Sequence, residues 1–370
     1  MRTEFSLKQW NVGHGGFNTQ SLRHYAISKL AHQANPFNIV YDCGSSGPQA
    51  NRLSDKIDEY VSGLKTERQT DIDALILSHM DEDHVNGVNL LLTKAAQSNI
   101  TIKKVLLPYL TPLQTLLLGA QNQHATQNND YLRILFAPQL FFSEFDIRET
   151  IPVPEGSSQQ VANWTNPQRQ STDWIFTTFN QPGKPHKPQE IDEIIGHYLP
   201  EVGNLRNLNR RKLIDISAKT PKIIKKIIGE LSQSLPKTKN HDDSVANFSS
   251  LCAYSGPSTH TKDQGNSSHS PIGWMGTGDA RLMLPPEINL FATAFQSQLS
   301  AVKIVSAPHH GSRRNSDINF WKLFPNMDTV TIEASGRYNL PNCEVLRAAS
   351  NYVSHVEIVN KIPYEYKVTL

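Results

Sequence analysis

The 370-residue chain lacks any long hydrophobic run. No stretch reaches the ~18 consecutive apolar residues that a membrane-spanning helix requires, and the first ten residues lack the apolar core of a secretory signal peptide. The net charge is only +2 and the hydrophobic content 38%, and neither value favours a particular class of partner. We therefore expect a soluble cytoplasmic protein without a membrane span, long enough for one large domain or two ordinary ones.

Cysteine is also scarce. The three cysteines, Cys43, Cys252 and Cys343, lie in or beside predicted strands or helices, and none forms a Cys-x-x-Cys pair. This usage favours buried free thiols in a reducing cytosol.

What the sequence does contain is a dense group of potential metal ligands. Residues 79–87 read His-Met-Asp-Glu-Asp-His-Val-Asn-Gly, which places four ligands within six residues: His79, Asp81, Asp83 and His84. The apolar residues 74–77 before them predict a buried strand. Val85, Val88 and Leu92 then recur at helical spacing, so Asp83 and His84 are expected at the start of a helix. The alternative is a polar surface loop rich in Asp and His.

Two later segments repeat this format of an apolar strand followed by ligands. Residues 274–279 (Trp-Met-Gly-Thr-Gly-Asp) end in Asp279, and residues 304–312 (Ile-Val-Ser-Ala-Pro-His-His-Gly-Ser) deliver His309 and His310. Alone, Gly-Asp is usually a turn, and a His pair is usually surface or core. Together the three segments place ligands at the C-terminal ends of strands, where open α/β sheets build their sites.

In these motifs the chain resembles the metallo-β-lactamase-fold hydrolases, and most of all the metallo-β-lactamase-like domain of bacterial competence proteins of the DNA-uptake channel. The resemblance covers roughly residues 1–108 and 246–360, and it is carried by His79-x-Asp81-x-Asp83-His84, Thr277-Gly278-Asp279 and Pro308-His309-His310-Gly311-Ser312, with weaker support from residues 11–15 and 40–44. It implies an α/β fold, a four-layered αββα sandwich, with the site at the sheet edges facing one end.

Three departures from the family pattern bear on the metal site. Asp81 stands where the superfamily most often has a second His, although Asp is usual in the competence-type branch. Residues 247–251 resemble that branch's Asn/Ser-rich strand and bring no imidazole, and Leu340 replaces the His of its Tyr-Gly-His-Pro element. One metal position is therefore expected to be under-liganded, weakly occupied or completed by water.

The ligand inventory indicates a site for two divalent ions. His79 and Asp81 would hold one ion, Asp83, His84 and either His309 or His310 the other, and Asp279 would bridge them. Two divalent ions against three carboxylates leave about one positive charge, which suits an anionic substrate. Because carboxylates are numerous, manganese rivals zinc.

Two more residues are expected beside the ligands. Asp42 would orient a metal-bound imidazole by accepting its free N–H. His14 lies near the site by family analogy, or it is a loop histidine that hydrogen-bonds backbone.

The predicted strands and helices form two α/β halves, residues 1–108 and 246–370, around an insertion at 109–245. In the first half we expect strands near 4–12, 38–42, 72–78 and 103–107, with helices near 48–64 and 84–98. In the second we expect strands near 249–254, 273–278, 301–306, 328–333 and 355–360, with helices near 285–298, 316–323 and 342–353.

The insertion contains a possible strand at 173–179 and a basic portion. Residues 205–240 carry ten Lys and Arg against two acidic residues, and Pro221 opens a helical pattern with an isoleucine-rich face. The basic residues could contact substrate phosphates, or they form the solvated face of a docked helix; the candidates are Arg210, Arg211, Lys222, Lys225 and Lys226.

These observations lead to one functional prediction and two alternatives. We expect a two-metal hydrolase acting on phosphodiester bonds of nucleic acid or a nucleotide, with Asp83 and Asp279 as catalytic residues. The first alternative is hydrolysis of thioester, lactone or lactam bonds. The second is a binding or scaffold protein whose degenerate site no longer turns over.

Overall fold

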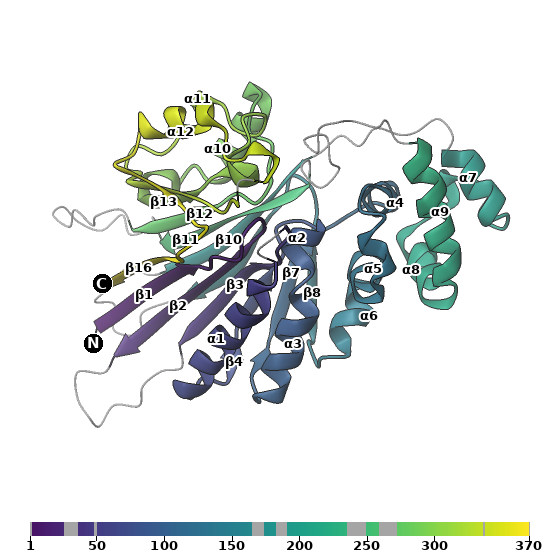
Figure 1. Ribbon diagram of the computed structural model, residues 1–370, viewed down its shortest axis with the longest axis horizontal. Helices are drawn as coiled ribbons and strands as arrows, with labels where there is room; N and C mark the ends of the chain where they lie inside the picture. Colours follow the sequence, from purple (N-terminus) through teal and green to yellow (C-terminus); the bar gives the residue numbers. More distant parts are fainter. Residues whose placement is uncertain are drawn as a thin grey trace.

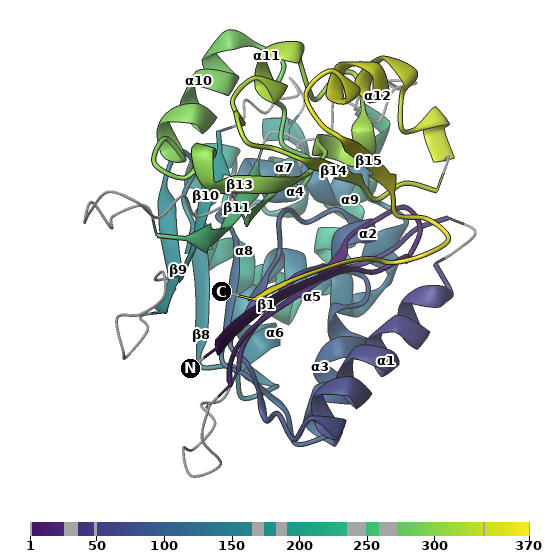
Figure 2. The ribbon, with the colours of Figure 1, turned by 90° about the vertical axis from the view of Figure 1, so that its left-hand side faces the viewer.

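Two mixed β-sheets of seven strands each pack face to face, and helices cover both outer faces (Figures 1 and 2). The computed structural model describes residues 2–25, 36–47, 50–164, 174–182, 191–234, 249–258, 272–335 and 337–369. The predicted α/β fold with four αββα layers is confirmed.

The first sheet joins the N-terminal half to the last strand of the chain. Its order is β16 (Tyr364–Thr369), β1 (Arg2–Gln9), β2 (Phe17–Tyr25), β3 (Phe37–Cys43), β5 (Ala74–Ile76), β7 (Lys104–Pro108) and β8 (Glu149–Val153). The strands from β16 to β3 run antiparallel, and those from β3 to β8 run parallel. Two short parallel strands, β4 (Asp71–Ile72) and β6 (Thr101–Ile102), pair separately.

The second sheet has the same division into antiparallel and parallel strands. Its order is β15 (His355–Ile358), β14 (Thr329–Ile332), β13 (Val302–Ser306), β12 (Gly273–Gly276), β11 (Ser250–Pro257), β10 (Trp174–Gln181) and β9 (Ser158–Trp164). The strands from β15 to β12 are parallel, and those from β12 to β9 are antiparallel. In each sheet the C-terminal ends of the parallel strands therefore lie at the same edge.

Alternation along the strands divides the apolar side chains among three cores. Phe5 and Leu7 of β1 meet Trp174 of β10 and Trp274 of β12 between the two sheets. The opposite face of the first sheet is covered by α1 (Arg52–Thr66) and α3 (Val88–Gln97), and that of the second by α10 (Pro285–Ala294), α11 (Ile318–Trp321) and α12 (Cys343–Ser350). The buried residues of α1 lie three or four apart and form one stripe: Leu53, Ile57, Val61 and Leu64.

A group of helices from the middle of the chain lies at one end of the molecule, on the right in Figure 1. It consists of α4 (Pro112–Gln121), η1 (Ala125–Gln127), α5 (Asn129–Phe136), α6 (Pro138–Ser143), α7 (Ile191–Tyr198), η2 (Leu205–Asn207), α8 (Arg210–Lys219) and α9 (Pro221–Ser234). The helix expected to begin at Pro221 is confirmed. Residues 109–245 also supply β8, β9 and β10, which complete the edges of both sheets.

Three sequence expectations need correction. The helix expected over residues 84–98 is two helices, α2 (Glu82–Val85) and α3, separated at Asn86 and Gly87. The strand β2 had no counterpart among the predicted elements. Cys343 is exposed at the start of α12, whereas Cys43 and Cys252 are buried as expected. Within the described ranges, no helix is long and apolar enough to cross a membrane.

Candidate metal centre

The first ligand segment is the loop between β5 and α2. Residues of β5 are fully buried, and His79, three residues after the strand, is 0% exposed. Asp81 stands at the N-cap of α2 with extended backbone (φ −69°, ψ 151°), and its carbonyl accepts a hydrogen bond from the N–H of His84 at 3.0 Å. Asp83 and His84 therefore occupy the first turn of this helix, as the sequence predicted.

The second ligand segment follows β12. Gly278 adopts a positive φ of 50°, and a Cβ there would lie 2.5 Å from the Ser250 hydroxyl oxygen, so the turn requires glycine. The N–H of Asp279 donates to that same hydroxyl at 3.2 Å. These contacts fix the buried Asp279 carboxylate beside the loop that carries His79.

The third ligand segment follows β13. His309 and His310 both have left-handed backbone, with φ of 46° and 53°, which is rare for two successive non-glycine residues. Sequence reasoning left open which of the two faces the site. The structure places both imidazoles there, because this backbone turns both buried rings toward Asp279.

Four imidazoles surround the Asp279 carboxylate. Its Oδ2 lies 3.5 Å from Nε2 of His79 and 3.5 Å from Nε2 of His309. Its Oδ1 lies 3.7 Å from Nε2 of His84 and 3.8 Å from Nε2 of His310. The two oxygens of one carboxylate thus face two different pairs of histidines.

The ligand atoms form two clusters. His79, His84 and Asp279 make the first cluster, and His14, Asp83 and His310 the second; within each, the ligand atoms lie within 4.8 Å of one another. This differs from the expected grouping, which put His84 with Asp83. Because α2 turns its His84 ring toward His79, with ring centroids 4.0 Å apart, His84 belongs to the first cluster, and His14 takes its place in the second.

Hydrogen bonds at the far side of each ring prepare its Nε2 for an ion. Nδ1 of His84 contacts Oδ2 of Asp42 at 2.9 Å, Nδ1 of His309 contacts Oδ1 of Asn315 at 2.9 Å, and Nδ1 of His310 contacts the carbonyl of Glu333 at 2.7 Å. These three partners accept, so each Nδ1 carries the proton. Each Nε2 then presents a lone pair to the site in the neutral ring.

Nδ1 of His79 also carries the proton, because its hydrogen-bond partner is the Ser78 hydroxyl. The Ser78 hydroxyl donates to Oδ2 of Asp42 at 2.7 Å, so it accepts from Nδ1 of His79 at 2.8 Å. Nε2 of His79 is then a buried atom without a hydrogen-bond partner, and Nδ1 of His14 is another. Two ligands on one ion with bonds of about 2.1 Å lie roughly 3.0–3.4 Å apart. The separations in the first cluster are close to this, so these residues fit a divalent cation.

The electrostatics of the clusters also favour positive charge. Burial tends to raise the pKa of Asp279, but the neighbouring His309 and His79 rings hold it well below its usual range. His84 and Asp83 show the same coupling: burial lowers the pKa of His84, yet Asp42 and Asp83 raise it well above its normal value. The Asp279 carboxylate is therefore ionised at neutral pH and attracts cations to this volume.

Two other groups near the clusters have shifted pKa values. Burial, with the nearby charge of His310, lowers the pKa of His14 to about 3, so His14 is a neutral ring at pH 7 and can act as a ligand. Burial raises the pKa of Glu333 to about 7. Glu333, Asn315 and Ser78 were missed by sequence reasoning, since nothing in their local pattern connects them with the ligands.

Asp81 and Leu340 are two of the three places at which the chain departs from the family pattern. Asp81 lies outside both clusters, with its Oδ2 3.9 Å from Nε2 of His79. Burial raises the pKa of Asp81 above its usual range, although the charge of His79 and a hydrogen bond from Asn122 act in the opposite direction. Leu340 is buried and offers no ligand atom.

The basic residues of the helical group have different surroundings. Arg210 donates from Nη1 to the Thr115 hydroxyl at 2.6 Å and from Nη2 to the Leu135 carbonyl at 3.3 Å, so its guanidinium serves internal contacts. Lys225 donates to the Gln127 carbonyl at 3.4 Å. Of the five basic candidates, Arg211, Lys222 and Lys226 have exposed side chains.

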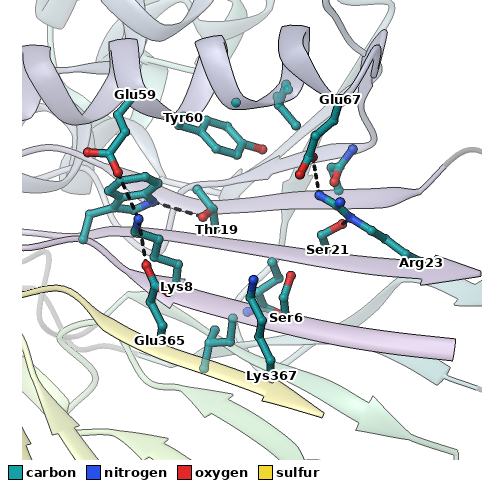
Figure 3. A pocket seen from close by; sticks show the side chains of 16 residues that line it. Ser6, Lys8, Thr19, Ser21, Arg23, Glu59, Tyr60, Glu67, Glu365 and Lys367 are labelled. Carbon is teal, nitrogen blue, oxygen red and sulfur yellow. Dashed lines mark hydrogen bonds and ion pairs between the residues drawn. The ribbon is translucent and has the colours of Figure 1, made fainter. Parts of the chain in front are cut away.

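A hollow of about 330 Å³ lies elsewhere, between α1 and the strands β16, β1 and β2 (Figure 3). Its charged side chains pair largely with one another: Lys8 contacts Glu59 at 3.1 Å and Glu365 at 2.9 Å, and Arg23 contacts Glu67. None of the candidate ligands lines it. The hollow is therefore separate from the two clusters.

A comparison with known protein families finds a match in the part of the chain that carries the first ligand segment. The family model described as the metallo-beta-lactamase superfamily matches residues 35–138, which include β3, the ligand loop and its two helices. Residues 35–138, just over a quarter of the chain, are thus similar to the metallo-β-lactamase superfamily. No curated protein matches the chain. The partial match and the two-sheet architecture agree on the metallo-β-lactamase fold.

Solved structures that are similar to this chain share little sequence with it. The metallo-beta-lactamase fold protein YhfI from Bacillus subtilis is 9% identical, with a TM-score of 0.42, covering 99% of this chain and 100% of that one. A diphosphatase from the PhnP family is 9% identical, with a TM-score of 0.40 and coverages of 100% and 99%. A long form RNase Z from yeast is 9% identical, with a TM-score of 0.37; the match covers 90% of this chain but 36% of that one.

Proposed function

We propose that this protein is a metal-dependent hydrolase that cleaves phosphodiester bonds in nucleic acid or a nucleotide. The observation that carries the proposal is the Asp279 carboxylate, whose two oxygens face His79 and His309 on one side and His84 and His310 on the other. A carboxylate placed between two pairs of imidazoles could help to hold two divalent ions, which would supply the charge stabilisation that a displacement at phosphorus needs.

The residues divide the work as follows. His79, His84 and Asp279 would hold one divalent ion, zinc or manganese, and His14, Asp83 and His310 the other. When bound, the two ions supply a nucleophile at neutral pH and offset the charge that develops on the phosphoryl group. Asp83 has a side chain 19% exposed, so it can accept a hydrogen bond from the attacking water and orient it.

Charge favours an anionic substrate. Asp81, Asp83 and Asp279 bring three negative charges to a site for two divalent ions, which leaves about one positive charge. The exposed Arg211, Lys222 and Lys226 add a basic surface that could hold a phosphate backbone. Lys225 is a weaker candidate and Arg210 the weakest, because both already donate within the protein. The competence-type resemblance of the ligand motifs points to the same substrate class by analogy.

The test combines metal content with cleavage. Protein purified without chelator would be analysed by elemental mass spectrometry and assayed on labelled single- and double-stranded DNA, RNA and bis-p-nitrophenyl phosphate. Asp279→Asn keeps the shape of the bridging side chain and should lower turnover at least 100-fold, as should Asp83→Asn. His355→Ala, on the exposed end of the second sheet, is the matched control and should behave as wild type.

The other outcomes separate the remaining functions. Two bound ions without phosphodiester cleavage, but with turnover of thioesters, lactones or lactams, would refute the substrate class and support acyl hydrolysis. Neither metal nor cleavage in the wild-type protein would refute the enzyme and favour a binding or scaffold role. Full turnover in Asp279→Asn would contradict the mechanism.

A further inference from the structure

The helix α4 ends against the ligand loop. Asn122, the C-cap of α4, donates from its side-chain Nδ2 to Oδ1 of Asp81 at 2.7 Å and to the carbonyl of Leu118 at 3.3 Å. Both neighbours can only accept, so the NH₂ group must be the end of the amide that faces them. The backbone N–H of Asn122 also donates to the Leu118 carbonyl at 3.0 Å, which fixes the position of the side chain.

Two neighbours of Asp81 are held from the same side. The Tyr131 hydroxyl of α5 donates to the carbonyl of Met80 at 2.9 Å, and the phenol ring is buried. Nε2 of His124 lies 2.6 Å from Oε2 of Glu82. The stretch between the ligands His79 and Asp83 is therefore held at all three of its residues by the segment that runs from α4 to α5.

The support behind this segment comes from α8 and α9. Arg210 of α8 bonds Thr115 in α4 and the Leu135 carbonyl in α5, and so ties the two helices together. Helix α9 packs closely on α4 at Gly119, where a Cβ would lie 3.0 Å from Cδ1 of Ile228. The helical group thus forms a continuous packed unit from α9 to the ligand loop.

The bond from Asn122 sets how the Asp81 carboxylate is oriented. Oδ1 faces the amide, whereas Oδ2 lies 3.9 Å from Nε2 of His79, beside the first cluster. A carboxylate anchored at one oxygen presents the other in a fixed direction. Loss of a hydrogen bond that a neighbouring residue makes to a metal ligand commonly changes metal affinity by 10–100-fold.

We infer that Asn122 is a positioning residue of the metal centre: its amide fixes Asp81 as a one-oxygen ligand for the ion at His79, His84 and Asp279, and the helical group braces the loop that carries them. The inference rests on the metal binding in the proposed function, but it does not depend on the substrate. It gives the helical group a role in building the site.

The experiment measures metal affinity instead of activity. Full-length protein is stripped of metal, and Zn²⁺ and Mn²⁺ are titrated in competition with a chromophoric chelator, with stoichiometry from elemental mass spectrometry. Asn122→Leu removes the donor at similar size and should weaken one of the two ions at least about tenfold while leaving the other within about twofold. Asn326→Leu is the matched control, because the same change falls on an exposed side chain outside the helical group that donates to the Ser300 carbonyl at 2.7 Å; it should leave both affinities unchanged.

Two further variants keep the inference falsifiable if Asn122→Leu does not fold. Asn122→Ala removes the amide without an apolar branch, and Tyr131→Phe removes only the hydroxyl that holds Met80; each should weaken the same ion. Thermal unfolding of the metal-free proteins reports whether the fold is retained. Unchanged affinities, or equal weakening of both ions, would overturn the inference. Two-ion binding with no cleavage of any phosphodiester would instead contradict the proposed function alone.

Discussion

Oδ2 of Asp42 lies 2.9 Å from Nδ1 of His84, and it also accepts the hydroxyl of Ser78 at 2.7 Å. Oδ1 of the same carboxylate accepts the Ser78 N–H at 2.6 Å. One buried side chain at the end of β3 therefore anchors both ends of the segment that carries the first ligands. It sets the direction of His84 directly and that of His79 through Ser78.

Replacing this carboxylate should weaken the metal centre without unfolding the protein. Asp42 has φ of 59°, a left-handed conformation that Asn tolerates as well as Asp, so Asp42→Asn suits the backbone. An amide offers only one accepting oxygen, so at least one of the three bonds is lost, and we expect metal affinity to fall about 10–100-fold. Chelator competition measures the effect. Asp58→Asn on α1, whose carboxylate pairs with Lys94 far from the loop, is the control; equal affinities in the two variants would contradict the prediction.

The close packing of Gly44 on the ligand loop gives a second prediction. A Cβ at Gly44 would lie 2.4 Å from the carbonyl oxygen of Asp83 and 2.6 Å from the carbonyl carbon of His84. Gly44→Ala must therefore displace the start of α2, and we expect a loss of roughly 1–3 kcal/mol in the free energy of unfolding together with weaker metal binding. Urea denaturation and chelator competition measure the two effects.

The control for this substitution lies in α1. Gly63 has no atom within 4 Å of the position of an added Cβ. Gly63→Ala should stabilise the helix by about 0.5–1 kcal/mol. If Gly44→Ala were as stable as Gly63→Ala, the described contact between the two loops would be wrong.

Thiol labelling tests the surroundings of the three cysteines. Cys43 and Cys252 are buried, and burial raises the pKa of both thiols far above neutrality, whereas Cys343 is exposed. Reaction follows the accessible thiolate. Native protein should therefore take up one iodoacetamide per chain at pH 8, and urea-denatured protein three, as read by intact mass spectrometry. Rapid labelling of a second thiol in the native protein would show that the core around it opens.

Arg210 and the exposed lysines of α9 should respond to different assays. Arg210→Met removes two internal hydrogen bonds from a charged group, and we expect the protein to lose about 2 kcal/mol of stability.

The double substitution Lys222→Ala and Lys226→Ala should change stability by less than about 0.5 kcal/mol, yet weaken binding of a labelled single-stranded oligonucleotide and reduce its salt dependence. Fluorescence anisotropy at several salt concentrations measures binding. Unchanged anisotropy curves for the lysine variant would remove the basic surface from the substrate site.

The sequence predicted the parts of the fold in which a local pattern was strong. Apolar runs predicted β5, β12 and β13, and the ligands that follow these strands lie close together in the structure. The strand β2 escaped prediction because its buried face includes polar residues: Asn18 is 2% exposed and Gln20 3%. Alternation of hydrophobic and polar residues, the signal on which strand prediction depends, is thereby lost.

Contacts between distant segments limited the prediction of the site. His84 lies beside His79 because of the way in which α2 is turned about its axis. The identity of the potential ligands in the sequence does not reveal this rotation. His309 and His310 both face inward through a left-handed backbone that is uncommon for histidine. Asn122 reaches Asp81 across 41 residues, and its sequence neighbours give no sign of that contact.

The pairing of β1 with β16, from Glu4 opposite Thr369 to Gln9 opposite Tyr364, has a consequence for biosynthesis. A growing chain that has released the loop of His79 and His84 still lacks Asp279, His309 and His310, and its first sheet lacks an edge strand. Neither cluster can then close around an ion, since each needs a residue from the second half. The centre is therefore complete only after both sheets have met, and a chain that ends before β12 offers a metal ion only part of each cluster.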